Sequence, residues 1–229
     1  MKKAIRIISI CIIVVAIFAA ITASMNSKPA NADIVWDQDM TMGDINAKNY
    51  YIIYSDLACP YCIFFENAIM EHQAEFEEYL KENDILLEVR LSDFLYEYGA
   101  HEAPASRLGA NAAYCAKKEG KFWDYYNSAI PTIYNDFFKT SSTAGFTYLN
   151  NTDIDYWIEI GTKIGLGEDF EKCTRNQDEL PSIMKNAEKT TKLISGMPYF
   201  KFNSYTFSGF DPNGDYHDAL QYLNAGLKK

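Results

Sequence analysis

Residues 49–62 read Asn49-Tyr-Tyr-Ile-Ile-Tyr-Ser-Asp-Leu-Ala-Cys-Pro-Tyr-Cys62, and they are the clearest indication of the fold in the sequence. The run from Asn49 to Ser55 is rich in β-branched and aromatic residues, which predicts a buried strand. Pro60 follows at a place where a helix can begin, because the first helical position tolerates a residue without an N–H group. The stretch therefore predicts a strand, then a helix whose N-terminus carries Cys59 and Cys62.

The residues after this motif predict a parallel βαβ unit. Apolar residues recur near helical spacing from 63 to 80, and the run Ile85–Leu91 (ILLEVRL) predicts a second buried strand. Asn83 and Asp84 separate the two segments. Two buried strands joined by a connection of helical length are typical of parallel pairing.

The rest of the chain predicts a helical block and then a return to the sheet. Helical patterns cover residues 105–118, 122–130 (ending before Pro131), 153–164, 169–174 and 180–195. Strand patterns follow at 199–203 and 205–208, and residues 215–228 predict a final helix. We therefore predict an α/β core formed by residues 34–103 and 195–229, interrupted by an all-helical insertion at residues 104–194.

The N-terminus has the layout of an export signal. Lys2, Lys3 and Arg6 precede an apolar run at residues 7–23, whose length is at the short limit for a membrane-spanning helix. The positive flank predicts that the N-terminus stays in the cytoplasm and the rest is exported. We predict a signal anchor at residues 1–23 and a linker at residues 24–33, which places the protein at the cell membrane. A cleaved signal peptide, giving a secreted or periplasmic protein, is the alternative.

Composition narrows the class of protein. Hydrophobic residues make up 48% of the chain and charged residues 23%, which is typical of globular domains. The chain has 21 Lys and Arg against 31 Asp and Glu, and its formal net charge is −10. Nucleic-acid binding needs a basic surface, so the composition argues against a nucleic-acid partner.

The five cysteines of the chain give the most specific information about its chemistry. Cys11 lies in the apolar run, so four cysteines remain in the exported part, and four allow three pairings. Pairing Cys59 with Cys62 leaves Cys115 and Cys173, which are either a disulfide or two buried free thiols. The sequence has no second Cys-x-x-Cys pair and only 3 scattered histidines, so we expect no metal site.

The position of the cysteine pair predicts redox chemistry. The first turn of a helix presents unpaired N–H groups and the positive end of the helix dipole, which stabilise a thiolate at Cys59 as the nucleophile. Cys62 lies one turn further along, where it can attack a mixed disulfide and release the partner. Residues 49–80 contain no Lys or Arg, so this stabilisation comes from the helix end or from another part of the fold. A zinc half-site and an inert structural disulfide are the alternatives.

These segments together resemble the DsbA family of exported thiol–disulfide oxidoreductases, over about residues 40–225. Residues 42–47 and 51–62 are similar to the first strand and active site of the family. Residues 111–126 resemble the first helices of its inserted domain, and Gly196-Met-Pro-Tyr-Phe200 resembles its cis-proline loop. The resemblance implies a thioredoxin-like core with a helical insertion.

The resemblance also implies roles for individual residues. Cys59 becomes the attacking thiol and Cys62 the buried one, while Pro60 and Tyr61 complete the active-site motif. Pro198 becomes a cis proline packed against the cysteine pair. No cofactor is implied, since the two sulfurs carry the chemistry.

Three further points follow from the resemblance. Met197, which precedes the proline, corresponds to the residue whose backbone binds the substrate chain by strand addition. Cys115 and Cys173 resemble a second, structural disulfide of some relatives. Members often carry an acidic residue in the strand before the motif, where this chain has Ile53. Asp56 lies nearby but at a different place, so the sequence does not identify the group that deprotonates Cys62.

The sequence thus predicts a membrane-tethered enzyme that donates the Cys59–Cys62 disulfide to exported proteins containing cysteine. A membrane or small-molecule partner would reoxidise it, and residues 7–23 would hold it in the membrane. A reductase or isomerase of the same fold, or a non-redox binding module, are the alternatives.

Overall fold

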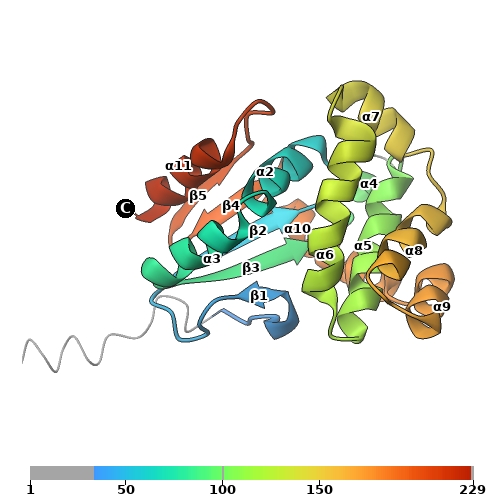
Figure 1. Ribbon diagram of the computed structural model, residues 1–229, viewed down its shortest axis with the longest axis horizontal. Coiled ribbons are helices and arrows are strands. Elements are labelled where there is room, and N and C mark those ends of the chain that lie inside the picture. The colour runs from blue at the N-terminus through green and yellow to red at the C-terminus, as the bar shows by residue number, and fades with distance from the viewer. Residues whose placement is uncertain (1–33, 100, 228–229) are drawn as a thin grey trace, which may run out of the picture.

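The computed structural model describes residues 34–99 and 101–227, which form a five-stranded sheet surrounded by helices (Figure 1). The strands are β1 (Thr41–Met42), β2 (Asn49–Ser55), β3 (Ile85–Leu91), β4 (Tyr199–Phe202) and β5 (Tyr205–Ser208), in the order β1-β3-β2-β4-β5. β2 and β3 are parallel, which confirms the predicted βαβ unit, and the other pairs are antiparallel. β2 lies at the centre, so the residues that follow it emerge in the middle of the sheet edge.

Two helices, rather than one, connect β2 to β3. The sequence pattern predicts a continuous helix through residue 80, but the chain forms α2 (Pro60–Met70) and α3 (Gln73–Glu82). His72 leaves the helical conformation, with φ −126° and ψ 34°, and its ring stacks on Tyr216 at 4.5 Å. This bend lets Ile69 and Phe76 pack into the same apolar cluster against the sheet.

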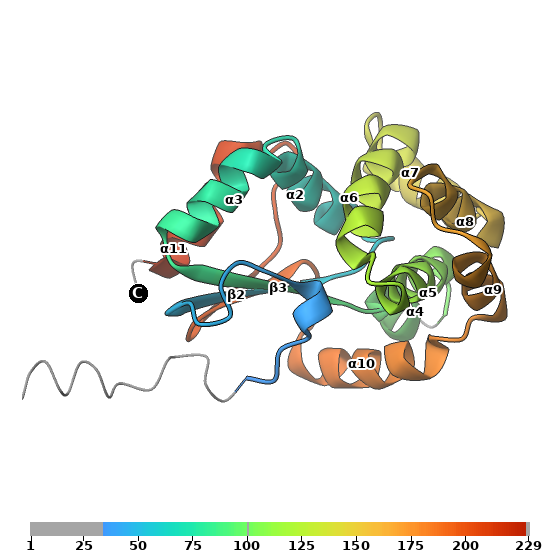
Figure 2. The same ribbon diagram turned by 60° about the horizontal axis from the view of Figure 1, so that its bottom comes forward.

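Helices cover the two faces of the sheet unequally. Figure 2 shows α2, α3 and α11 (Tyr216–Leu227) on one side and α10 (Leu180–Leu193) on the other. The first side holds an apolar cluster that includes Tyr51, Phe65, Phe200 and Leu223. The second side holds a smaller cluster that contains Cys59 and Cys62, so the cysteine pair is built into the core of the sheet.

The interval from residue 104 to residue 193 contains helical elements without a strand, within the residues that the structure describes. Besides α10 these are α5 (Pro104–Lys118), α6 (Phe122–Ile133), η2 (Tyr134–Phe138), α7 (Ser142–Leu149), α8 (Ile154–Lys163) and α9 (Glu168–Asn176). A short helix, α4 (Phe94–Tyr98), precedes them. This interval packs beside the sheet at the end where α2 begins (Figure 1).

One helix end in this interval differs from the prediction. The sequence predicts an end before Pro131, yet α6 continues to Ile133 and passes into η2, a π-helical turn. Pro131 removes one backbone N–H, but the Tyr134 N–H reaches the carbonyl of Ile130 and the helix resumes. Ile130 and Ile133 are fully buried, so packing favours the longer helix over the break that proline alone would cause.

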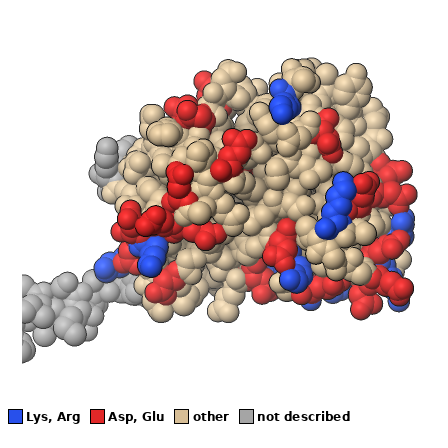
Figure 3. Space-filling view, viewed as in Figure 1, with Lys and Arg blue, Asp and Glu red and all other residues tan. Residues whose placement is uncertain are grey.

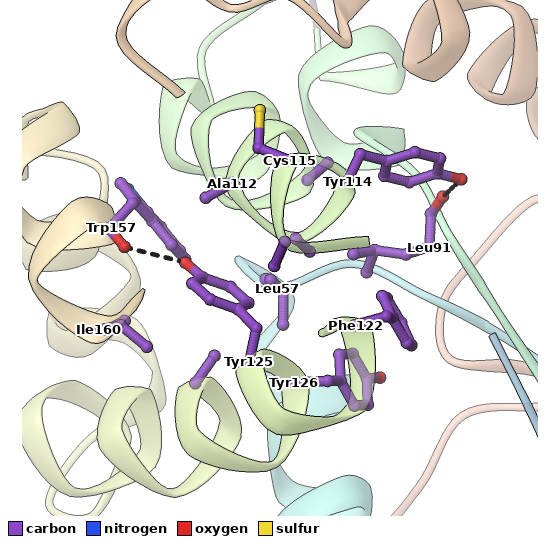
Figure 4. Packing of buried hydrophobic residues seen from close by; sticks show 14 of the residues in the cluster. Leu57, Leu91, Ala112, Tyr114, Cys115, Phe122, Tyr125, Tyr126, Trp157 and Ile160 are labelled. Carbon is purple, nitrogen blue, oxygen red and sulfur yellow. Dashed lines mark hydrogen bonds between the residues drawn. The ribbon is translucent and has the colours of Figure 1, made fainter. Parts of the chain in front are cut away.

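The helical cluster extends to the residues before the cysteine motif. Leu57 packs among residues of α5, α6 and α8, and the Tyr125 hydroxyl donates to the Trp157 carbonyl at 3.1 Å (Figure 4). Gly109 makes this packing possible, since a Cβ there would lie 2.7 Å from the Trp157 ring and 3.1 Å from Leu57. The helices and the motif loop therefore share one core.

The N-terminal part of the described chain lies along the sheet. A short turn, η1 (Gln38–Met40), leads into β1, and the Asp37 N–H donates to the Glu88 carboxylate at 2.9 Å. The predicted signal anchor or signal peptide at residues 1–23 and the linker at residues 24–33 lie outside the described residues. Among the helices of residues 34–227, none has the length and apolar content needed to cross a membrane.

Charge is mixed over the surface. In Figure 3, acidic side chains are scattered over the visible face, and the basic side chains lie among them without forming a continuous basic stripe. This distribution agrees with the formal net charge of −10.

Candidate active site

Cys59 caps the N-terminus of α2. Its backbone is extended, with φ −80° and ψ 115°, and Pro60 is the first helical residue. The Cys59 carbonyl accepts the N–H of Ile63 at 3.0 Å, and its N–H donates to the Asp56 carbonyl at 3.0 Å. The Cys59 side chain therefore leaves the chain at the positive end of the helix dipole.

The loop before β4 lies against this cysteine. The Cys59 thiol is 3.8 Å from the carbonyl oxygen of Met197, and the Met197–Pro198 peptide bond is cis. The Pro198 carbonyl accepts the N–H of Gly209 at 2.9 Å, which ties the loop to the end of β5. The fold thus brings residues 59 and 197–198 together from distant parts of the sequence.

Cys62 is the inner member of the pair. Both cysteines are free thiols in this structure, and Cys62 has no exposed surface, compared with 3% for Cys59. Burial raises the pKa of the Cys62 thiol well above its usual value. Its hydrogen bond with Cys59 and the charges of Cys59, Glu66 and Asp56 raise it further. The pair is therefore asymmetric: Cys59 keeps a small exposed surface at the helix terminus, whereas Cys62 is fully enclosed and kept protonated.

Asp56 anchors the loop that carries the motif. One carboxylate oxygen accepts the Ala58 N–H at 2.8 Å, and the other accepts the Leu95 N–H at 2.8 Å and the Ser106 hydroxyl at 2.6 Å. These bonds join the loop to α4 and α5. Burial raises the pKa of this carboxyl to about 6, although the hydrogen bonds oppose the rise.

Glu66 is a second buried carboxyl, and the sequence reasoning did not single it out. It lies on α2 with 3% of its surface exposed, and neither carboxylate oxygen makes a hydrogen bond of normal geometry. Burial raises its pKa to about 7, while the nearby Tyr126 and Ser55 hydroxyls lower it. The sequence feature that could have pointed to Glu66 is its position four residues after Cys62, because this spacing puts both side chains on one face of a helix.

The exposed part of the motif is aromatic. Tyr61 has 45% of its surface exposed, and its ring contacts Phe64 edge-on at 6.4 Å. Phe64 in turn packs against Tyr134 and Phe138 of η2. An aromatic side chain therefore stands at the surface two residues after Cys59.

The other two cysteines are joined to each other. Cys115 of α5 and Cys173 of α9 form a disulfide, and the Asn111 amide donates to the Thr174 carbonyl at 3.0 Å beside it. Both sulfurs are buried in the helical cluster, in which Figure 4 shows Cys115. Within the described residues, no group of three or more His, Cys, Asp or Glu side chains could hold a metal ion.

A central parallel strand, a Cys-x-x-Cys pair at a helix N-terminus and an adjacent cis proline define a thioredoxin-like protein with a dithiol site. A family model described as thioredoxin matches residues 36–220, and the chain belongs to this family. No curated protein sequence matches the chain significantly.

Solved structures extend the likeness to most of the chain. α-DsbA1 of Wolbachia pipientis superposes with a TM-score of 0.59 at 13% identity, covering 88% of this chain and 96% of that one. BdbD of Bacillus subtilis, in its oxidised form, gives 0.55 at 17% identity, with 83% and 93% covered. The reduced disulfide bond oxidoreductase DsbG of Mycobacterium tuberculosis gives 0.54 at 18% identity, with 85% and 84% covered. The fold of the described residues is therefore that of DsbA-type proteins.

Proposed function

We propose that this protein is a thiol–disulfide oxidoreductase that donates a disulfide between Cys59 and Cys62 to cysteine-containing proteins. The observation that carries the proposal is the placement of the Cys59 thiol, at the N-terminus of α2 and 3.8 Å from the Met197 carbonyl. Cys62 lies fully buried on the same helix. A nucleophilic thiol at a helix N-terminus, backed by a second thiol one turn further along, is an arrangement that supports disulfide exchange.

The reaction has two exchange steps. A substrate thiolate attacks Cys59, the Cys59–Cys62 bond breaks, and Cys62 leaves with the electron pair and takes up a proton. A second substrate thiolate then attacks the mixed disulfide, which forms the substrate disulfide and releases Cys59. The substrate loses two electrons and the cysteine pair gains them, so a membrane or small-molecule oxidant must restore the enzyme.

Substrate chains would dock at the loop before β4. The Met197 carbonyl lies beside Cys59, so an extended segment that hydrogen-bonds to the backbone at Met197 would bring its own cysteine to the attacking sulfur. Backbone pairing does not depend on side-chain identity, which suits an enzyme acting on many proteins. The exposed Tyr61 ring offers an additional aromatic contact.

We further propose that the catalytic part is exported and tethered to the membrane by residues 7–23. The Cys115–Cys173 disulfide supports this location, because such bonds persist in oxidising compartments. The catalytic part would comprise the thioredoxin-like core, residues 34–103 and 195–229, and the helical insertion at 104–194.

Reoxidation of reduced, unfolded ribonuclease by the oxidised protein tests the activity. We expect turnover with glutathione disulfide as the terminal oxidant, and we expect Cys59→Ser to abolish it. Cys62→Ser should trap a mixed disulfide that intact-mass analysis detects. A Cys115→Ala/Cys173→Ala variant serves as the cysteine control and should retain exchange. Turnover that survives in Cys59→Ser would overturn the proposal.

The reduction potential decides the direction of exchange. A value near about −120 to −160 mV would support donation of the disulfide. A value of about −230 mV or lower would instead assign a reductase, and recovery of scrambled ribonuclease without oxidant would assign an isomerase. A pair that does not equilibrate with glutathione would indicate a non-redox binding module.

A further inference from the structure

Arg107 of α5 makes three contacts with the short helix α4 and the residue before it. Its Nε donates to the Asp93 carboxylate at 2.8 Å, its Nη2 donates to the Glu97 carboxylate, and its Cζ lies 3.8 Å from the centroid of the Tyr96 ring. The Asp93 side chain is fully buried, and the Arg107 side chain is 17% exposed. A single cation therefore holds a whole turn of the chain, from residue 93 to residue 97.

The helix α4 needs contacts of this kind to keep its place. It spans only Phe94–Tyr98. Isolated helices shorter than about 12–15 residues are marginal in water, so its own hydrogen bonds do not stabilise it sufficiently. Phe94 is its only buried residue, and the Asp93 side chain does not cap its N-terminus. The bonds to Arg107 therefore contribute substantially to holding α4 against α5.

This helix in turn forms part of the enclosure of the cysteine pair. The Phe94 ring belongs to the apolar cluster that contains Cys59 and Cys62. The next residue, Leu95, donates its N–H at 2.8 Å to Asp56 of the motif loop. A displacement of α4 would therefore open the cluster around Cys62 and break one of the bonds that fix the motif loop.

We propose that Arg107 is a positioning residue: by holding α4 against α5 it keeps Cys62 enclosed, so that thiols and disulfides from outside react at Cys59 alone. This inference rests on the proposed function. In that reaction a substrate thiolate forms its bond with Cys59, and Cys62 leaves with the electron pair. Attack at Cys62 would instead release Cys59 and attach the substrate to the inner sulfur. The enclosure thus decides which of the two sulfurs carries the substrate.

Arg175 of α9 offers a matched comparison within the same protein. Its guanidinium also bridges two carboxylates, Asp155 at 2.7 Å and Glu171 at 2.8 Å, but its side chain is 44% exposed. These three residues lie outside the cluster that holds the cysteine pair. Exposed ion pairs contribute little to stability, because water and salt screen them. Removal of the Arg175 cation should therefore leave the enclosure of the pair unchanged.

Alkylation of Cys62 in the full-length, reduced protein at increasing urea concentrations tests this role. Iodoacetamide labelling is followed for each cysteine by peptide mass analysis. In the wild type Cys62 should react slowly, at a rate that rises steeply with urea, because global unfolding exposes it. Arg107→Met keeps an unbranched side chain but removes two hydrogen bonds to charged groups, so it should favour local opening of α4 by about 10- to 100-fold. Without urea, Cys62 should then react faster by that order, and low urea should change its rate little, because local opening exposes little surface.

Two further variants separate positioning from a general effect on stability. Arg107→Lys keeps a cation that can reach one of the two carboxylates, so it should restore part of the protection of Cys62. Arg175→Met should keep the wild-type rate of Cys62 labelling. If Arg107→Met does not fold, Arg107→Lys decides, and we expect its labelling to be weaker than a full loss of protection but still independent of low urea.

The products of exchange provide a second readout. When glutathione reacts with the oxidised protein, acid quenching should trap it on Cys59 alone in the wild type and on both cysteines in Arg107→Met. Labelling of Cys62 that rises as steeply with urea in the Arg107 variants as in the wild type would overturn the inference, because Arg107 would then stabilise only the global fold. A wild-type disulfide that does not react with glutathione would refute the proposed function, whereas alkylation of the reduced protein would still decide the role of Arg107.

Discussion

The Cys59 thiol lies 3.8 Å from the carbonyl oxygen of Met197, although 138 positions separate the two residues in the chain. The pairing of β2 with β4 creates this contact, because Ile53 lies opposite Phe200 and Tyr54 lies opposite Tyr199. The residues just after β2 and just before β4 must then meet at the same edge of the sheet. The site is thus a consequence of strand register as well as of the motif.

The asymmetry of the cysteine pair predicts selective alkylation. In the reduced protein at pH 7, iodoacetamide should modify Cys59 and leave Cys62 intact, because burial raises the pKa of Cys62 and leaves little thiolate there. Peptide mass analysis after brief labelling measures the two sites separately. In denaturant both should react, which provides the control. Equal modification of the two cysteines in the folded protein would contradict the assigned geometry.

The hydrogen bond between Ser106 and Asp56 predicts a stability effect remote from the sulfurs. Both residues are fully buried, and Ser106→Ala leaves a carboxylate oxygen with one donor fewer. Hydrogen bonds to charged groups contribute about 1.5–3 kcal/mol, so the free energy of unfolding should fall by about 2 kcal/mol at pH 8. Urea denaturation measures this change. Ser182→Ala, at an exposed position of α10, should change the same quantity by less than about 0.5 kcal/mol.

The sequence predicts much of this fold for physical reasons that are local. The apolar run of β2 and the apolar run of β3 identify buried strands, and they pair in parallel as expected. Asp153 shows that caps are local as well, since its side chain accepts the Asp155 N–H at the start of α8. The bend at His72 and the continuation of α6 past Pro131 were not predicted, because each depends on packing against residues distant in sequence.

The active site depends even more than the fold on contacts between residues distant in sequence, which local patterns do not reveal. The motif itself is visible in the sequence, and the roles of Cys59, Cys62 and Met197 remain predictions for experiment to test. The contacts of Asp56 with Leu95 and Ser106 join three segments, so no local pattern could indicate them. Glu66 resembles any other acidic residue on a charged helix until burial sets it apart.

The Cys115–Cys173 disulfide predicts a contribution to stability without a direct role in exchange. It joins α5 to α9 across 58 positions, and closing a loop of this length lowers the entropy of the unfolded chain. The double variant Cys115→Ala/Cys173→Ala should lose about 2–4 kcal/mol of unfolding free energy in guanidinium denaturation. The reduction potential of the Cys59–Cys62 pair should be unchanged. A shift of that potential by more than about 30 mV would show that the two disulfides are energetically linked.

The two buried carboxyl groups predict an unusual pH dependence of stability. Burial raises the pKa of Asp56 to about 6 and that of Glu66 to about 7, whereas unfolded chains titrate near about 3.9 and 4.3. Between these limits the folded state binds more protons than the unfolded state. The contribution of these groups to the free energy of unfolding must therefore fall as the pH rises from about 4 to 7.

Removing one of the two groups should flatten this dependence. Glu66→Gln cannot titrate, so relative to the wild type it should gain up to about 3 kcal/mol of unfolding free energy between pH 4 and pH 8. Urea denaturation at a series of pH values measures the difference, and comparing slopes cancels any constant cost of the substitution. Glu78→Gln should follow the wild-type curve, because position 78 is exposed and burial cannot raise a pKa there. Parallel curves for wild type and Glu66→Gln would mean that Glu66 keeps its charge in the folded protein.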